Sequence, residues 1–497
     1  MTLWKNIKEH PKTEILSLFQ SDVKRAENFS FGHDGLFFDF SKTHLTADLL
    51  DKFDELAQSL EIDQKISALL SGDRINISEN RAAEHSAERG VGAKTSIENA
   101  RLLQNRMKAL IGAIDAGALG EIEHIIHLGI GGSALGPELL IEALKIGDEK
   151  YDTAIVSNID GSALEPVLEK FDAHKTLLVI ASKSFSTAET FLNTESVLSW
   201  MKQEGVDDPF GKIVALTADP EKAVEWGVDE NRILPFSETV GGRYSIWSSI
   251  GFSVALTLGV EVFEDLLAGA KTMDEHFRDQ PFDQNLPVLA AFCDQYYLQS
   301  CQYETRAVFS YDERLRLLPD YLQQLEMESN GKSVSIEGEE LSLNSAPITW
   351  GGVGTDAQHA VFQLLHQGTQ IVPVEFLAVS EPGHSLDPAH HQGLLLNCFA
   401  QGAALMAGKQ SDDPHRNYTG DRPSVTILME SLEARTLGAL LAFYEHRTFV
   451  NSALLGINPF DQFGVELGKE MARKLLDTDG NQLDPSTEQL KKRAFGA

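Results

Sequence analysis

Short apolar segments alternate with amphipathic ones four times in the first half of this 497-residue chain. The apolar segments, at residues 123–128, 153–158, 176–181 and 212–217, have the length of buried strands, and apolar residues recur at helical spacing after each of them. Strands that alternate with helices pair into a parallel sheet that helices cover on both faces. The sequence therefore predicts an α/β fold.

A second set of strands follows a long helical stretch at residues 261–303. Apolar segments at residues 307–311, 347–350 and 371–378 predict these strands. A chain of this length has room for two large domains, since a domain takes roughly 150 residues or more. We therefore expect two α/β domains.

Charge and composition restrict the partners. Subtracting 74 acidic from 42 basic residues gives a formal net charge of −32, which repels nucleic acid and anionic lipid. The chain has no apolar stretch long enough to span a membrane, and its first residues lack a signal-peptide core. Cys293, Cys301 and Cys398 lack the close pairing of a disulfide framework or a zinc site. We expect a cytoplasmic protein that binds neither nucleic acid nor membranes.

A glycine turn at residues 129–133 (Gly-Ile-Gly-Gly-Ser) joins the first predicted strand to its helix. The backbone N–H groups of such a turn, together with the helix N-terminus, can bind an anion such as phosphate. Gly129, Gly131 and Ala134 equally satisfy the dinucleotide fingerprint, and Asp160 lies near the end of the next strand. The turn alone leaves both alternatives open.

Hydroxyl groups crowd the loop after the third predicted strand, which we call the hydroxyl loop (residues 182–190). Loops after neighbouring parallel strands meet at one edge of the sheet, so Ser133, Ser182, Ser184 and Thr187 can donate to one phosphate. Helix capping is the alternative, because Ser and Thr are favoured N-cap residues. A cap needs one hydroxyl and this loop has several, which favours binding of a phosphate monoester.

Three other side chains are candidates for chemistry. Arg243 follows two glycines, where a ligand can approach closely, although a surface arginine is the commoner explanation. Glu328 lies beside a turn and is by default a solvated carboxylate. His359 falls in the first turn of a predicted helix, where a proton shuttle and a core histidine are equally plausible. None of the three identifies a site by itself.

Two residues near the C-terminus share a helical spacing. Gln462 and Lys469 are seven residues apart, which predicts that they lie on one face of a helix, as any amphipathic helix would also arrange them. The chain from Asp477 onward is polar and is predicted as a loosely held tail.

Two further motifs mislead. Residues 331–333 (Gly-Lys-Ser) look like the end of a nucleotide P-loop, but that motif requires a glycine where this chain has Glu326. His384, His390 and His391 cluster in sequence without a helical His-x-x-x-His spacing or paired cysteines. We predict neither a nucleotide site nor a metal site there.

Six segments, taken together and in this order, closely resemble the glucose-6-phosphate isomerase family. They span residues 129–469, about two thirds of the chain. The segments are Gly-Ile-Gly-Gly-Ser-Ala-Leu-Gly-Pro, Ser-Lys-Ser-Phe-Ser-Thr-Ala-Glu-Thr, Gly-Gly-Arg-Tyr-Ser-Ile-Trp-Ser, Met-Glu-Ser-Asn-Gly-Lys, Gly-Thr-Asp-Ala-Gln-His and Phe-Gly-Val-Glu-Leu-Gly-Lys. Six motifs in series are far more specific than any one of them.

The resemblance implies two sugar isomerase (SIS) domains, each a parallel sheet between helices in an αβα sandwich. The small domain would cover residues 96–262 and the large domain residues 263–455. A mainly helical segment at residues 1–95 would pack on the large domain, and residues 456–497 would form a C-terminal helix and tail.

The resemblance also implies an activity, the interconversion of D-glucose 6-phosphate and D-fructose 6-phosphate in glycolysis and gluconeogenesis. It implies ring opening followed by proton transfer through a cis-enediolate, with no cofactor and no metal. Glu328 would move the hydrogen between C2 and C1, and Arg243 would stabilise the negative charge. His359 and Lys469 would move protons at the ring and hydroxyl oxygens.

The same resemblance assigns the remaining site residues. The residues that would bind the sugar phosphate are Gly132, Ser133, Ser182, Lys183, Ser184, Thr187, Gln324 and Gln462. A homodimer is implied in which His359 completes the site of the neighbouring subunit. Two alternatives are an isomerase that also accepts mannose 6-phosphate and a non-catalytic sugar-phosphate sensor. The intact catalytic set argues against the sensor.

This chain departs from the common family pattern at a few positions. Asp356-Ala357 stands where the family often has Asn-Gly, and Ser184 stands where a threonine is common. Ser184 keeps a hydroxyl, so we expect phosphate binding to be retained. The family motif near residues 76–89 is degenerate, which concerns the packing of the N-terminal segment rather than the chemistry.

Overall fold

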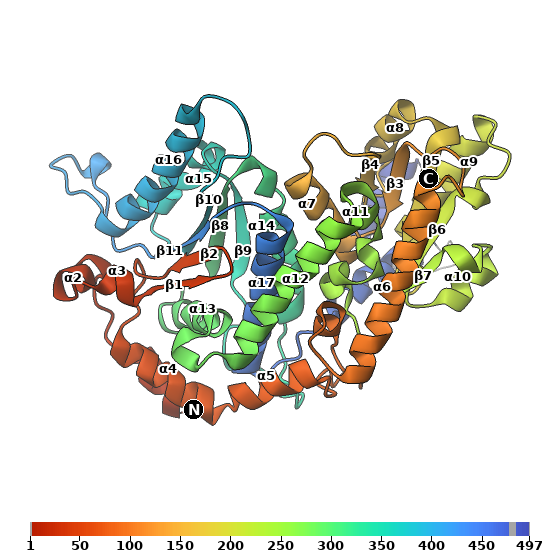
Figure 1. The fold of residues 1–497 in the computed structure, drawn as a ribbon. Helices are drawn as coiled ribbons and strands as arrows, with labels where there is room; N and C mark the ends of the chain where they lie inside the picture. The colour runs from red at the N-terminus through yellow and green to blue at the C-terminus, as the bar shows by residue number, and fades with distance from the viewer. Residues whose placement is uncertain (1, 477–483, 497) are drawn as a thin grey trace. The chain divides into compact units, whose positions relative to one another are not determined.

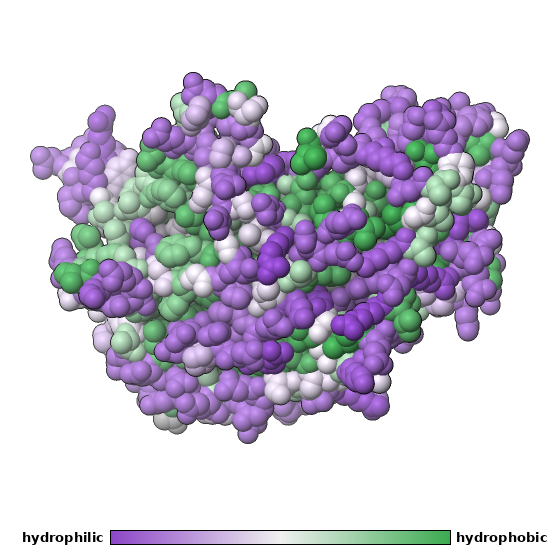
Figure 2. All heavy atoms as spheres, in the orientation of Figure 1, coloured by the Kyte–Doolittle hydropathy of each residue, from purple (hydrophilic) through white to green (hydrophobic). Residues whose placement is uncertain are grey.

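The structure is a computed structural model that describes residues 2–476 and 484–496. The chain divides into a compact unit that ends at Phe460 and a second unit that begins at Asp461. The first unit contains two β-sheets (Figure 1). The face of the molecule shown in Figure 2 is largely hydrophilic, in keeping with the many acidic residues.

The predicted strands form the centres of both sheets. In spatial order, the five-stranded sheet contains β4 (Asp152–Val156), β3 (His124–Leu128), β5 (Thr176–Ala181), β6 (Ile213–Thr217) and β7 (Ile233–Pro235), all parallel. The six-stranded sheet contains β1 (Ser30–His33), β2 (Leu36–Asp39), β11 (Ser424–Met429), β10 (Val374–Val379), β8 (Thr305–Tyr311) and β9 (Ile348–Val353). Its last four strands are parallel.

Helices cover the sheets and connect them. Those before the five-stranded sheet are α1 (Thr2–Lys8), α2 (Ile15–Ser21), α3 (Arg25–Asn28), α4 (Ala47–Ser59), α5 (Ile62–Ser71) and α6 (Lys94–Asp115). Those within or after it are α7 (Leu135–Leu144), α8 (Gly161–Lys170), α9 (Ala188–Gln203), α10 (Pro220–Trp226), α11 (Phe252–Leu258), α12 (Val260–Asp279) and α13 (Leu286–Gln295). The remaining helices are α14 (Leu318–Gln323), α15 (Asp356–Gln367), α16 (Pro388–Ala407), α17 (Ala434–Leu455), α18 (Glu466–Leu476) and α19 (Pro485–Phe495).

Alternate residues of each central strand enter different hydrophobic cores. In β5, Val179 belongs to a core that includes residues of α6, α7 and α11, whereas Ile180 belongs to a second core that includes residues of α8, α9 and α10. In β8, Val308 and Phe309 are divided between two cores in the same way. Each sheet is therefore sandwiched, which confirms the predicted fold class. Both sheets belong to one compact unit, and the predicted domain boundaries stay a prediction.

The N-terminal segment contains a hairpin that we did not predict. Strands β1 and β2 pair antiparallel, and β2 pairs antiparallel with β11, so the hairpin extends the six-stranded sheet. The turn consists of Asp34 and Gly35, whose φ angles are 44° and 77°. Asp-Gly is favoured in two-residue hairpin turns because both residues must adopt positive φ. The Asp-Gly pair was therefore a local sequence signal for the hairpin, although the neighbouring segments are helical.

The helical stretch predicted at residues 261–303 is interrupted. Helix α12 ends at Asp279, and α13 begins at Leu286. Pro281 and Pro287 explain the break, because proline cannot donate a backbone hydrogen bond and is tolerated mainly in the first turn of a helix. One long helix is therefore replaced by two helices.

Part of the predicted C-terminal tail forms a helix. Part of the predicted tail, residues 477–483, lies outside the described residues. Pro485–Phe495 forms α19, and Asp484 caps this helix by accepting hydrogen bonds from the backbone of Ser486 and Thr487, both at 3.0 Å. Among the described residues, no helix combines the length and the apolar character needed to cross a membrane.

Candidate active site

The glycine turn lies at the carboxyl end of β3, directly before α7. Buried His127, on β3, contacts this turn: its Nε2 lies 2.7 Å from the carbonyl oxygen of Ser133, and its Nδ1 lies 2.8 Å from Ser253 Oγ. Burial lowers the pKa of His127 to about 4, so the imidazole is neutral near pH 7. His127 therefore holds the turn in place without adding a positive charge next to it.

Two glycines let the turn touch other predicted segments. A Cβ on Gly132 would lie 2.2 Å from the carbonyl oxygen of Gly242, and a Cβ on Gly131 would lie 2.8 Å from Gln324 Nε2. Gly131 also has a φ of +57°, which few L residues adopt. The glycine turn thus packs directly against the segments that carry Arg243 and Glu328.

The hydroxyl loop follows β5, which is the neighbour of β3 in the sheet. Ser182 Oγ lies 3.0 Å from Thr187 Oγ1, and Ser184 Oγ lies 2.8 Å from Ser186 Oγ. Phe185 is buried between them with a φ of 47°, so Ser184 and Ser186 stay exposed. Thr187 occupies the N-cap position of α9 but makes no side-chain capping bond. Capping alone therefore does not explain these hydroxyls.

Lys183 ties the hydroxyl loop to the segment before Arg243. Its Nζ donates to the carbonyl oxygens of Glu238 at 2.9 Å and Val240 at 2.8 Å. Burial, reinforced by nearby Arg81, lowers the pKa of Lys183 to about 8. Two of its three protons are thus committed to the protein backbone.

Arg243 is buried rather than on the surface, so the surface interpretation of this residue is wrong. Its Nε donates to Ser329 Oγ at 2.6 Å, and its Nη2 donates to the carbonyl oxygen of Pro459. Its Nη1 lies 3.6 Å from Glu328 Oε1. The guanidinium plane is therefore fixed on one side while its third nitrogen faces the Glu328 carboxylate.

Glu328 lies at the end of a π turn, Gln324–Glu328, that continues α14. Gln324 Nε2 donates to Glu328 Oε2 at 2.7 Å, so each carboxylate oxygen faces a different partner. The Glu328 side chain is only 21% exposed, which excludes a fully solvated carboxylate. Single π turns within helices are frequent at functional sites.

His359 lies in the first turn of α15, as predicted, and its side chain is exposed, so the core-histidine alternative is wrong. Within residues 2–476 and 484–496, this side chain makes no hydrogen bond or ion pair, with Glu328 or with any other residue. An exposed imidazole without a partner is available to a ligand or to another protein chain.

Gln462 and Lys469 belong to the second compact unit. Helix α18 begins only at Glu466, and Gln462 precedes a 3₁₀ turn, Phe463–Val465. The prediction that the two residues share one helical face is wrong, because the helix does not reach back to Gln462. A glutamine-to-lysine spacing cannot reveal where the helix starts.

The structure describes the residues of both misleading motifs. Lys332 Nζ donates to the backbone carbonyls of Glu328 and Ser329, at 3.1 and 3.0 Å. The rings of His384, His390 and His391 lie near one another. Over the ranges that the structure describes, no group of three or more His, Cys, Asp or Glu side chains is placed to hold a metal ion.

Sequence reasoning missed the residues that hold Arg243. Ser329 is fully buried and contacts both Arg243 Nε and Tyr244 Oη, the latter at 2.9 Å. Pro459 contributes only a carbonyl oxygen, for which no sequence signal exists. Ser329 and Tyr244 stand directly beside Glu328 and Arg243, and that adjacency was the one available clue.

The model of one protein family matches most of the chain. Residues 39–490 match the family model described as phosphoglucose isomerase. The chain belongs to the phosphoglucose isomerase family. The resemblance predicted from the six motifs is thereby confirmed, and the match extends well beyond them on both sides.

Individual members of the phosphoglucose isomerase family are similar over their whole length. A glucose-6-phosphate isomerase of Rhizorhabdus wittichii is 59% identical over 493 residues, covering 99% of each chain. One of Zymomonas mobilis is 56% identical over 488 residues, covering 98% of this chain and 96% of the relative. A crystal structure of a glucose-6-phosphate isomerase from Chlamydia trachomatis superposes with a TM-score of 0.91 at 30% identity, covering 100% of this chain and 98% of that one.

Proposed function

We propose that this protein interconverts D-glucose 6-phosphate and D-fructose 6-phosphate. The observation that carries the proposal is the Glu328 carboxylate, held between Gln324 and Arg243 beside the glycine turn. A partly buried carboxylate fixed next to a permanent positive charge is suited to proton abstraction α to a carbonyl. Family membership supports the same reaction.

The central step is assigned to Glu328. It takes the hydrogen from C2 of the open-chain aldose and returns it to C1 of the cis-enediolate, which gives the ketose. Negative charge develops on the enediolate oxygens, and Arg243 is fixed where it can stabilise that charge without rearranging. Gln324 orients the second carboxylate oxygen. No nucleotide, nicotinamide or metal is needed for this transfer.

The phosphate is assigned to the edge of the five-stranded sheet. Gly132 and Ser133 offer the glycine turn, and Ser182, Ser184 and Thr187 offer the hydroxyl loop from the neighbouring strand. Lys183 stabilises this loop through its backbone contacts and adds a positive charge there. Gln462 is proposed as a further phosphate ligand, by family resemblance.

Ring opening is assigned to His359 and Lys469, which would move protons at the ring and hydroxyl oxygens. The exposure of His359 and its lack of a partner in the described part of the chain suit a residue that serves another subunit. We therefore include in the proposal a homodimer in which His359 completes the neighbouring site. By family resemblance, the proposal also includes a cytoplasmic location and a role in glycolysis and gluconeogenesis.

Exposed apolar side chains on two neighbouring helices support the homodimer. Helices α15 and α16 lie side by side, joined by a hydrogen bond from Gln358 Nε2 to Asn397 Oδ1 at 3.3 Å. Leu364, Leu396 and Phe399 on these helices are 44%, 59% and 43% exposed. Exposed large apolar side chains on neighbouring helices favour association with another protein surface. His359 lies on α15 as well, and in a twofold dimer each chain can offer this imidazole to its partner.

Mixed dimers test the shared site. A Glu328→Gln chain and a His359→Ala chain, each nearly inactive alone, would form a mixed dimer with one doubly damaged site and one intact site. We expect co-expression to restore about a quarter of wild-type activity if chains pair randomly. Steady-state assays on the whole mixture of the two differently tagged chains, before mixed dimers are selected, measure this recovery. Mixed dimers without recovered turnover would mean that both residues serve the same subunit's site.

A coupled assay of the purified protein tests the activity itself. Fructose 6-phosphate, glucose 6-phosphate and mannose 6-phosphate would be offered separately, with and without EDTA. We expect conversion between the first two that EDTA leaves unchanged, because each assigned group is an ordinary side chain. Loss of activity on chelation, reversed by one added metal, would contradict the metal-free mechanism. Binding without turnover would favour the sensor, and turnover of mannose 6-phosphate the broader isomerase.

A further inference from the structure

The π turn that carries Glu328 presents its polar residues in opposite directions. Gln324 and Glu328 are half-buried and hydrogen-bonded to each other on the side of the site. Glu326, between them, is only 7% exposed and points into the protein interior. A buried carboxylate in this position requires compensating partners.

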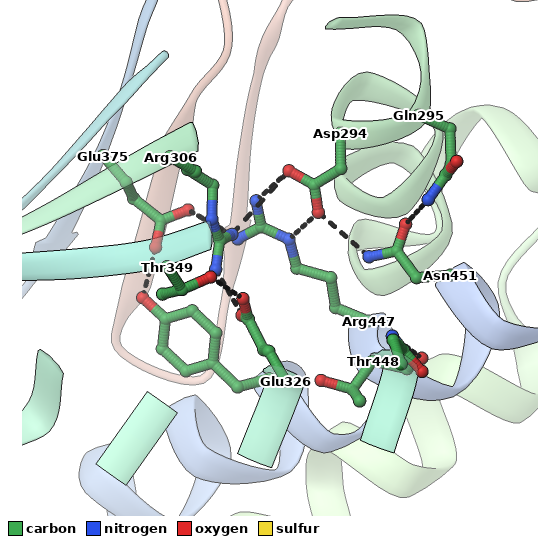
Figure 3. A network of polar contacts seen from close by, with 11 residues as sticks. Asp294, Gln295, Arg306, Glu326, Thr349, Glu375, Arg447, Thr448 and Asn451 are labelled. Atoms are coloured by element: carbon green, nitrogen blue, oxygen red, sulfur yellow. Dashed lines mark hydrogen bonds and ion pairs between the residues drawn. The ribbon is translucent and has the colours of Figure 1, made fainter. Parts of the chain in front are cut away.

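Glu326 receives one hydrogen bond on each carboxylate oxygen (Figure 3). Arg306 Nη2 donates to Oε1, and Thr349 Oγ1 donates to Oε2 at 2.7 Å. Arg306 lies on β8 and Thr349 on β9, and the two residues are direct partners in the register of these parallel strands. The two donors are thus fixed side by side on the rigid sheet.

Arg306 is itself held by a wider network of buried charges (Figure 3). Its Nη1 lies 3.7 Å from Asp294 Oδ1 and 3.9 Å from Glu375 Oε2. Arg447 bridges the same two carboxylates, donating to Asp294 Oδ2 at 2.7 Å and to Glu375 Oε2 at 2.6 Å. The Arg306 guanidinium therefore has little freedom to follow Glu326 if the π turn shifts.

We propose that Glu326 is a positioning residue, which clamps the π turn to the paired residues Arg306 and Thr349 and thereby holds Glu328 in its catalytic place. The clamp lies two residues from Glu328, on the opposite side of the same turn. Releasing one end lets the turn relax toward ordinary helix, which rotates the Glu328 carboxylate away from Arg243. This inference rests on the proposed isomerase activity, because the role of Glu326 acts only through Glu328.

Thr349 provides a sharp test, because its substitution leaves every charge in place. Thr349→Val is nearly isosteric and removes the donor to Glu326 Oε2, whereas Thr349→Ser keeps it. We expect Thr349→Val to lower kcat about three- to tenfold with the KM for fructose 6-phosphate within about twofold, and Thr349→Ser to restore most of kcat.

Thr448 provides the matched control. It is a fully buried threonine in the same region, and its Oγ1 has no hydrogen-bond partner among the described residues. We expect Thr448→Val to leave kcat unchanged. Thermal unfolding of both variants shows whether any lost stability, rather than the lost donor, accounts for lost turnover.

Glu326→Gln weakens both contacts at once and should lower kcat more, about ten- to a hundredfold, in whatever fraction remains folded. If Glu326→Gln does not fold, the Thr349 variants still decide the matter. A folded Thr349→Val protein with wild-type kcat would overturn the inference while leaving the proposed activity intact. Absence of isomerisation by the unsubstituted protein would instead remove the proposed function.

Discussion

Glu328→Gln is expected to lower kcat by about two to four orders of magnitude while leaving the KM for fructose 6-phosphate nearly unchanged. The amide keeps the shape of the side chain and can still contact Gln324 and Arg243, but it cannot accept the C2 hydrogen. The substitution leaves unchanged the phosphate-binding groups assigned to the glycine turn and the hydroxyl loop. Steady-state kinetics in both directions, with calorimetric substrate binding, separate turnover from affinity.

Glu313→Gln is the matched control, because Glu313 is an exposed glutamate at the start of a short 3₁₀ turn. It should retain wild-type kcat. Solvent exchange of the C2 hydrogen gives an independent readout for Glu328→Gln. Exchange at the wild-type rate in that variant would show that another group is the base.

Arg243→Lys should lower kcat by about a hundredfold, even though the positive charge is kept. The guanidinium uses three nitrogens at once, donating to Ser329 Oγ and to the Pro459 carbonyl while Nη1 faces Glu328. A single ammonium cannot reproduce that planar fork, so the charge would move away from the enediolate. Kinetics and thermal unfolding on the same preparation distinguish misplaced charge from loss of fold.

Arg278→Lys provides the comparison, since Arg278 is exposed and its ion pair within the described residues is with its neighbour Asp279 at 2.7 Å. We expect it to behave as the unsubstituted protein in both assays. Wild-type turnover by a folded Arg243→Lys protein would remove Arg243 from the charge-stabilising role.

The sheets were predictable because their strands are short apolar runs between helical segments. Strands β3, β5 and β6 lie within one residue of their predicted ranges, since continuous burial on both faces leaves a strong signal. The β1–β2 hairpin was missed because its strands are short and its partner, β11, lies almost 400 residues away. Pairing over such a distance leaves no local pattern.

The candidate site was harder to predict from single residues than from their order. Burial distinguishes Arg243 and Glu328 from ordinary surface residues, and burial at a turn depends on segments distant in sequence. Only the resemblance of six motifs in series indicated that these residues belong together. The π turn itself was not predictable, because the residues that hold Glu326 come from two other strands.

The proton-transfer mechanism is tested most directly with glucose 6-phosphate that carries deuterium at C2, converted in ordinary water in the presence of EDTA. In the proposed mechanism the hydrogen resides on Glu328 between its removal and its return, and exchange with water competes during that time. We predict fructose 6-phosphate with part of the deuterium at C1 and the remainder lost to solvent, as nuclear magnetic resonance would show. Complete retention of the label in every product would indicate direct hydride transfer and would contradict the proposed proton-transfer mechanism. A failure to form fructose 6-phosphate would contradict it as well.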